Sequence, residues 1–309
     1  MTHARRSCLS VPGTQQRFHD KAEESSADMV MFDLEDSVVP AAKARGREMV
    51  VAALRGHEYA GKLRSVRVNA GDSQWCFEDI RAVVEGAGER LDTIVLPKVE
   101  GARHVHFADV LLRQLEAAGG LERRIGLEVQ IESARGLESV SEIASASPRL
   151  ESLIFGPGDL MATLGVPELT IGRTPDYSGE FFHYVHWRIL VAARANGLQA
   201  IDGPYAQVRD LEGLRRSALP AAALGYDGKW ALTPNQAEVL NEVFAPRQED
   251  FDKAAAILDA YAHATGVEQT GAVMLGEEMI DEASRKLAAV MVERGRAAGM
   301  TARPWQPAT

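Results

Sequence analysis

Short runs of apolar and β-branched residues recur along the chain and predict β-strands. Several runs are continuously apolar instead of alternating with polar residues, which is typical of strands buried on both faces of a parallel sheet. The eight runs lie at residues 7–11, 29–34, 65–69, 93–99, 125–131, 150–156, 198–202 and 229–232.

The segments between these runs predict the helices that connect parallel strands. Their apolar residues recur at spacings of three and four, and several segments end near glycine. The predicted helices lie at residues 41–55, 76–91, 102–120, 139–147, 181–197, 211–225 and 234–244. Eight strands alternating with helices in 309 residues predict a (β/α)₈ TIM barrel of the α/β class. A doubly wound sheet is the weaker alternative, because no GxGxxG pattern follows the first strand.

The pattern changes after Pro246, where two further helices are predicted at 250–265 and 282–299. We therefore expect a barrel domain over residues 1–245 and a C-terminal helical extension over residues 246–309. So short an extension makes a poor independent core. We expect it to pack on its own barrel or on a neighbouring subunit.

Composition and charge exclude several classes of protein. The chain has 34 basic and 44 acidic side chains, a net charge of −10, which argues against a nucleic-acid partner. No apolar run approaches the roughly 20 residues of a membrane span, and the N-terminus lacks the apolar segment of a signal peptide. We expect a cytoplasmic protein with no membrane partner. Cys8 and Cys76 form neither a disulfide framework nor a CxxC site, so we interpret both as reduced and structural.

Polar residues follow the predicted strands at the carboxyl end, where barrel enzymes place their active sites. Glu132 and Asp159 end adjacent strands, so their carboxylates could converge on one point. Two hard oxygen donors with room for water and substrate suit Mg²⁺, with Mn²⁺ as an alternative. Two capping or salt-bridged carboxylates are the other interpretation. The glycines of GPGD (156–159) favour the metal, because glycine lets the backbone approach a ligand.

Two cationic residues leave alternatives open. Arg67 projects from an apolar strand and needs an anionic partner, which is either a substrate or the acidic DLED segment at 33–36. Lys98 follows another predicted strand, and a lysine at that place suggests a catalytic amine that forms a Schiff base. We disfavour that role, because a magnesium site would already supply the electron sink.

Two weaker signals lie elsewhere in the chain. A glycine turn precedes a helix that carries Arg17 and Lys21, an arrangement that can bind phosphate, although such side chains are more often solvated. His183 and His186 are spaced as helical metal ligands. Aromatic residues interleave with them, which favours packing over a second metal site.

A set of motifs runs in one order along nearly the whole chain. They are RSCLSVPGTQQRFHDK, MVMFDLEDSVV, SVRVN, VLPKVE, IESARG, FGPGDL, IDGPY, LGYDGKWALTP and EEMID. In these motifs the chain resembles the citrate lyase β-subunit-like (HpcH/HpaI aldolase) superfamily. It is most similar to the malyl-CoA and β-methylmalyl-CoA lyase branch.

The resemblance implies a fold, an assembly and roles for particular residues. It implies a TIM barrel with a C-terminal extension, assembled as homotrimers or hexamers. Glu132 and Asp159 would hold Mg²⁺, and Arg67 would bind substrate oxygens. Asp281 of EEMID would be the acid/base, contributed to a neighbouring subunit's site. The residues that would bind CoA or substrate are Ser10, Pro12, Gly13, Lys21, Arg67, Gly158, Asp159, Leu232 and Thr233.

The implied activity is a reversible Claisen-type cleavage of a malyl-CoA, β-methylmalyl-CoA or citramalyl-CoA. The products would be an acyl-CoA and a small 2-oxoacid, glyoxylate or pyruvate. One alternative is a malyl-CoA thioesterase, or a malate synthase-like hydrolase, that releases malate and CoA. Another is a citrate lyase β-type subunit that acts on a carrier-bound acyl group.

Overall fold

The chain divides into two compact units. The computed structural model describes residues 3–173 and 181–304. One unit covers residues 5–244, and the other joins residues 245–309 to the first four residues.

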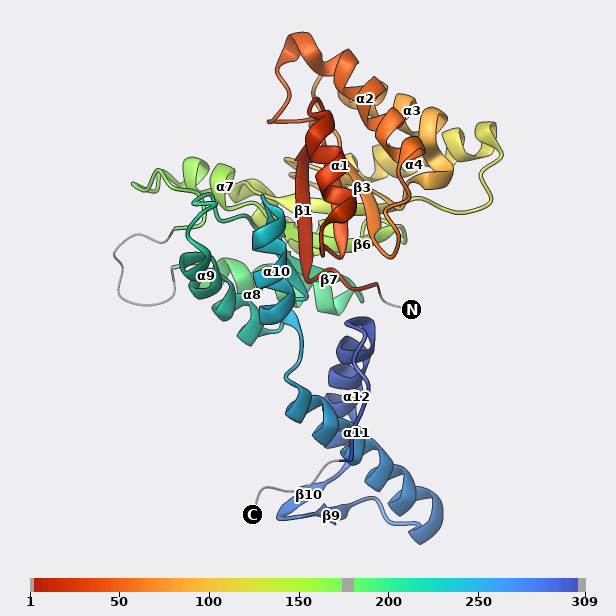
Figure 1. Ribbon diagram of the computed structural model, residues 1–309, viewed down its shortest axis with the longest axis vertical. Helices are drawn as coiled ribbons and strands as arrows, with labels where there is room; N and C mark the ends of the chain where they lie inside the picture. Colours follow the sequence, from red (N-terminus) through yellow and green to blue (C-terminus); the bar gives the residue numbers. More distant parts are fainter. Residues whose placement is uncertain (1–2, 174–180, 305–309) are drawn as a thin grey trace. The chain divides into compact units, whose positions relative to one another are not determined.

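The larger unit is a closed barrel of eight parallel strands in sequence order (Figure 1). The strands are β1 (Ser7–Pro12), β2 (Met29–Asp33), β3 (Leu63–Arg67), β4 (Thr93–Leu96), β5 (Gly126–Ile131), β6 (Leu150–Phe155), β7 (Gln199–Asp202) and β8 (Gly228–Ala231). The barrel closes where β1 pairs with β8, with Ser7 opposite Lys229. The predicted TIM barrel is therefore confirmed, and the doubly wound alternative is wrong.

Helices surround the strands. They are α1 (Gln16–Glu24), α2 (Lys43–Gly56), α3 (Cys76–Ala87), α4 (Ala102–Gly119), α5 (Ala134–Glu138), α6 (Val140–Ala144), α7 (Pro157–Leu164), α8 (His183–Ala195), α9 (Leu211–Leu224) and α10 (Pro234–Phe244). The pairs α2–α3 and α3–α4 are in contact, and these helices lie together in Figure 1.

Two helical predictions need correction. The helix predicted at 139–147 is present but shorter, as α6, and the preceding helix α5, which meets it at Ser139, was not predicted. Helix α7 was not predicted, although Pro157 stands at its first turn and Gly165 ends it with φ +68°. Helices commonly begin at proline and end at glycine. Here both residues lie in a sequence segment that resembles a loop, so the helix was overlooked.

The barrel interior is filled by a small apolar cluster, and a larger core lies between strands and helices. The interior cluster consists of Cys8, Met29, Met31, Leu63, Val95, Ile154, Ile201 and Trp230. Both Cys8 and Cys76 are buried and free, as predicted. With the interior filled by side chains, a ligand site of this unit is expected at a barrel end.

The smaller unit contains α11 (Gln248–His263), a hairpin of β9 (Val273–Leu275) and β10 (Glu278–Ile280), and α12 (Glu282–Ala297). The two helices pack on a small core that includes Phe251 and Val292. Both helices were predicted, whereas the hairpin was not, because its strands have only three residues each. Among the residues that the structure describes, no helix is both long and apolar enough to cross a membrane.

Candidate active site

A cavity of about 820 Å³ lies at the carboxyl ends of the strands. It brings together most of the residues that sequence analysis singled out for metal and substrate binding. The predicted residues that line it are Ser10, Pro12, Arg67, Glu132, Gly158, Asp159 and Leu232. Polar residues that end separate strands therefore share one space, as expected for a barrel active site.

Arg67 is buried and lies among the carboxylates of the acidic segment after β2. Its Nε and Nη2 donate to the two carboxylate oxygens of Asp33 at 2.7 and 2.8 Å. Its Nη1 lies 3.0 Å from Glu35 Oε2 and 3.8 Å from Asp36 Oδ2. Burial would raise the pKa of Asp33, but the Arg67 guanidinium outweighs burial and lowers it. The guanidinium also lies over the Trp230 ring, 5.3 Å from its centroid, and lines the cavity.

Both alternatives left open for Arg67 thus have a structural basis. The guanidinium pairs with the DLED segment, and it also faces the space where a substrate would bind. Asp33 binds it in the bidentate geometry that fixes the plane of a guanidinium. Arg67 is therefore a rigidly held cation at the wall of the cavity.

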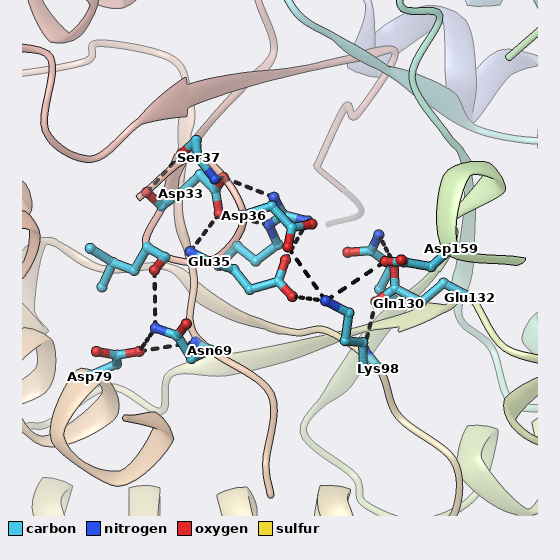
Figure 2. Close-up of polar contacts among 12 residues, drawn as sticks. Asp33, Glu35, Asp36, Ser37, Asn69, Asp79, Lys98, Gln130, Glu132 and Asp159 are labelled. Carbon is cyan, nitrogen blue, oxygen red and sulfur yellow. Dashed lines mark hydrogen bonds and ion pairs between the residues drawn. The ribbon is translucent and has the colours of Figure 1, made fainter. Parts of the chain in front are cut away.

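Buried donors hold the backbone of the acidic segment. Lys43 Nζ donates to the carbonyl oxygens of Leu34 and Glu35, each at 2.8 Å. Asn69 Nδ2 donates to the Leu34 carbonyl at 3.0 Å and to Asp79 Oδ2 at 2.6 Å (Figure 2). Lys43 and Asp79 were missed in the sequence, where each is one polar residue of an amphipathic helix.

Lys98 lies between the acidic segment and the Glu132–Asp159 pair (Figure 2). Its Nζ is 2.5 Å from Glu35 Oε1, 3.4 Å from Asp36 Oδ1 and 3.8 Å from Asp159 Oδ2. Burial would lower the pKa of Lys98, but the bond to Glu35 and the nearby carboxylates raise it well above its ordinary value. The amine is therefore protonated, which disfavours a Schiff-base role.

Glu132 is only 2% exposed, yet both of its oxygens are held by neutral amides. Oε1 accepts the backbone N–H of Lys98 at 2.6 Å, and Oε2 accepts from Gln130 Nε2 at 2.6 Å. Burial, reinforced by the nearby carboxylates of Asp159 and Glu35, raises the pKa of Glu132 to about 8. Gln130 was missed, although a polar residue inside the apolar run IGLEVQI is a usable signal.

These features fit a hard divalent cation. Glu132 directly follows β5, the partly exposed Asp159 lies in the first turn of α7, and both line the same cavity. Gln130 Oε1, next to them, is buried without a hydrogen-bond partner. Within residues 3–173 and 181–304, no three His, Cys, Asp or Glu side chains are grouped as metal ligands. The pair would therefore leave positions for water and substrate, as Mg²⁺ sites commonly do.

A second cleft, of about 570 Å³, adjoins the first. Ser10, Pro12 and Leu232 line both spaces. The second cleft also contains Lys21 and Thr233, so it unites most of the residues predicted for CoA. Apolar side chains from β1, α1 and the loop before α9 make up much of the remaining lining.

Gly13, unlike the other residues predicted to bind CoA or substrate, lies outside the two cavities. It is not among the described residues that line either cavity. Its N–H donates to the Asp33 carbonyl at 2.8 Å, and an added Cβ would lie 2.7 Å from that oxygen. The structure thus gives Gly13 a packing role between the first loop and β2.

Asp281 belongs to the smaller unit, where it caps α12. Its Oδ1 accepts from the N–H of Ser284 at 3.0 Å and from the Ser284 hydroxyl at 3.2 Å. The Ser284 N–H in particular lowers the pKa of Asp281. This capping bond favours the ionised form of the carboxylate.

His186 packs as the aromatic pattern of α8 suggested. Its ring lies edge-on to Phe155 and Tyr226, and its Nε2 is 3.2 Å from Asp202 Oδ1. Asp202 Oδ2 also accepts from Lys229 Nζ at 2.6 Å. These three side chains form a buried polar cluster between α8, β7 and β8.

Comparisons with known proteins agree with this geometry. A model of the family described as HpcH/HpaI aldolase/citrate lyase matches residues 6–234. The chain is 36% identical over 300 residues to an L-malyl-CoA/β-methylmalyl-CoA lyase of Rhodobacter capsulatus, covering 94% of each chain. It is 35% identical to the citrate lyase subunit beta of Escherichia coli, covering 97% of this chain and 96% of that protein.

A solved structure is similar as well. The protein CitE of Mycobacterium tuberculosis, in complex with magnesium, acetoacetate and coenzyme A, is 29% identical with a TM-score of 0.70. The match covers 96% of this chain and 100% of that one. These matches cover nearly the whole chain, and the barrel carries carboxylates in the cavity at its carboxyl end. Both findings support the same family assignment. The chain belongs to the HpcH/HpaI aldolase/citrate lyase family and is a carbon–carbon lyase.

Proposed function

We propose that this lyase acts on CoA esters and depends on Mg²⁺. The substrate would be of the malyl-CoA, β-methylmalyl-CoA or citramalyl-CoA type, and the products an acyl-CoA and glyoxylate or pyruvate. The observation that carries the proposal is that Glu132 and Asp159 line one cavity together with Arg67, while the hydrogen bonds to Glu132 come from amides. The names of the Rhodobacter and Mycobacterium relatives support the choice of substrate and metal.

Each residue of the site has a task in the reaction. When bound by Glu132 and Asp159, Mg²⁺ would act as a Lewis acid toward the oxygens of the 2-oxoacid. In the condensation direction, Asp281 takes a proton from the α-carbon of the acyl thioester. The enolate carbon then bonds to the carbonyl carbon of the 2-oxoacid, whose oxygen takes up a proton. Arg67, fixed by Asp33, stabilises the negative charge that develops. Cleavage is the reverse of these steps.

The second cleft would hold the CoA portion of the substrate. Lys21 supplies a cation for its phosphates, and Ser10, Pro12, Leu232 and Thr233 line its path to the reaction cavity. Asp281 lies in the smaller unit and would reach the site of a neighbouring subunit in a homotrimer or hexamer. The C-terminal extension, residues 246–309, would then serve as a lid.

The direct test is condensation by the purified full-length protein. It is incubated with Mg²⁺, glyoxylate and acetyl-CoA or propionyl-CoA, and the products are followed by mass, with EDTA as the control. A malyl-CoA or methylmalyl-CoA mass that EDTA abolishes is the expected result. Free CoA with malate would instead indicate a hydrolase or synthase. Inactivity with every CoA ester would favour a carrier-bound acyl group, the alternative that similarity to a citrate lyase β-subunit supports.

A further inference from the structure

The reaction cavity has an apolar wall in addition to its charged residues. The wall is formed by the end of α7 and the loop that follows it, and it consists of Met161, Ala162, Val166, Leu169 and Ile171. Leu169 is 99% exposed and Ile171 is 39% exposed. Apolar side chains that face an open cavity together are a typical feature of a binding site for apolar ligand atoms.

Ile171 lies against Gly158, next to Asp159 in the chain, and lines the same cavity as both carboxylates. An added Cβ on Gly158 would be only 3.1 Å from Ile171 Cδ1 and 3.3 Å from its Cγ1, so the side chain covers Gly158. Gly158 immediately precedes Asp159 in the chain. A substrate held between Arg67 and the carboxylates would therefore have Ile171 as an apolar neighbour.

Backbone contacts anchor this part of the wall. The Ile171 carbonyl accepts the N–H of Ala206 at 3.0 Å. Gly172, with φ +81°, packs so tightly that an added Cβ would lie 2.5 Å from the Pro204 carbonyl oxygen. The loop after α7 is thereby attached to the loop after β7, and Ile171 has a defined place in the cavity.

We infer that this wall binds an alkyl substituent on one of the two carbons that the reaction joins, and that Ile171 determines the preference for it. The inference rests on the proposed function and specifies its substrate class. Substrate pairs that carry an alkyl group at the reacting carbons should be preferred over the unsubstituted pair, acetyl-CoA with glyoxylate. Each methylene group buried against the wall should raise kcat/KM about fourfold.

The substituent could belong to the acyl group or to the 2-oxoacid, and two series of substrates distinguish these sources. One series combines glyoxylate with acetyl-, propionyl- and butyryl-CoA, and the other combines acetyl-CoA with glyoxylate, pyruvate and 2-oxobutyrate. We expect kcat/KM to rise in one series for the wild-type protein. Ile171→Ala should reduce that rise to less than about twofold, because the truncated side chain no longer contacts the added methylenes.

A matched variant controls for effects on α7 itself. Leu164→Ala truncates a side chain at the end of the same helix that is 53% exposed and outside the described lining of the cavity. This variant should retain the wild-type substrate ratio. Thermal melting of both variants checks that their folds are intact.

Binding without turnover provides an independent measurement. Calorimetry with Mg²⁺ compares the affinities of the wild-type protein and Ile171→Ala for the members of both series. Flat or falling kcat/KM in both series, or an unchanged ratio in Ile171→Ala, would overturn the inference and leave the lyase function standing. If no pair gives EDTA-sensitive turnover, the proposed function fails. The affinities measured in both calorimetric series then still show whether the wall binds alkyl groups.

Discussion

Carboxylates that are equally buried in this barrel have opposite electrostatic surroundings. Asp33 and Asp202 each contact a cationic side chain, and in both cases the cation outweighs burial and lowers the pKa. Glu132 is held by amides, and burial raises its pKa to about 8. This difference separates the carboxylates that pair with a cation from Glu132, which we propose as a metal ligand.

Glu132→Gln tests the metal-binding role. The amide has nearly the same shape but lacks the negative charge, so we expect Mg²⁺ affinity to fall at least about tenfold and kcat/KM about 100-fold. Calorimetric titration with Mg²⁺ and steady-state kinetics measure these effects. Glu138→Gln, an exposed carboxylate at the end of α5, is the control and should change neither. Wild-type Mg²⁺ affinity in Glu132→Gln would contradict the assignment.

Asp202 should stabilise the fold in a pH-dependent way. Its pKa is lowered in the folded protein, so the ionised carboxylate contributes stability at pH values above that of an unfolded aspartate, about 3.9. That contribution is lost as the pH falls through the pKa of the folded state. Asp202→Asn leaves Lys229 without its anionic partner and should lower the free energy of unfolding at pH 7 by about 3–5 kcal/mol.

Denaturant unfolding at pH 7 and at pH 3.5 measures both effects. Because the variant lacks the titrating carboxylate, it should lose less stability than the wild type between these two pH values. Asp72→Asn, at a side chain that is 75% exposed, is the matched control and should behave like the wild type. Equal losses in Asp202→Asn and the wild type would show that Asp202 does not carry this pH dependence.

At the scale of the elements, local patterns predicted the strands and most helices, and the departures lie at prolines and at one short break. The run predicted as a strand at 93–99 ends at Leu96, because Pro97 cannot donate to the sheet and Lys98 turns with φ +53° toward the acidic segment. A break at Ser139 and a helix that begins at Pro157 are equally local exceptions. All eight strands nevertheless occur where the apolar runs lie.

The closure of the barrel depends on a glycine at the start of β8. An added Cβ on Gly228 would lie 1.8 Å from the Arg5 carbonyl oxygen, just before β1. Gly228→Ala should therefore force the β1–β8 contact apart and lower the free energy of unfolding by about 3 kcal/mol. Gly56→Ala, at the end of α2 with no atom within 4 Å of the added Cβ, should change it by less than about 1 kcal/mol. Equal stability of the two variants in denaturant would contradict this account of closure.

At the scale of the whole molecule, the proposed active site draws on both compact units. Arg67, Glu132 and Asp159 lie in the barrel unit, whereas Asp281 lies in the unit that contains α11 and α12. Homo-oligomers allow one subunit to complete the site of another. Whether Asp281 acts in its own chain or in a neighbour's can be decided by mixing subunits.

Asp281→Asn and Glu132→Gln should each be nearly inactive as pure proteins. If Asp281 serves a neighbouring subunit, co-expressed hybrids contain sites with both wild-type residues, and random assembly restores about a quarter of wild-type activity. If Asp281 serves its own chain, no site in the hybrid is complete and activity stays absent. Kinetics of the co-purified hybrid, compared with separately purified and unmixed variants, distinguish these outcomes.

Sequence alone determined the barrel, because the alternation of apolar runs and amphipathic segments is a local property that each stretch of chain carries. It also predicted Glu132 and Asp159 at the same edge of the barrel, since parallel strands bring their carboxyl ends to one edge. Only the tertiary structure decided which charges pair. Lys98 meets Glu35 across 63 positions, and Ile171 lies on Gly158. Such contacts depend on how distant loops pack together, and no short stretch of residues contains that information.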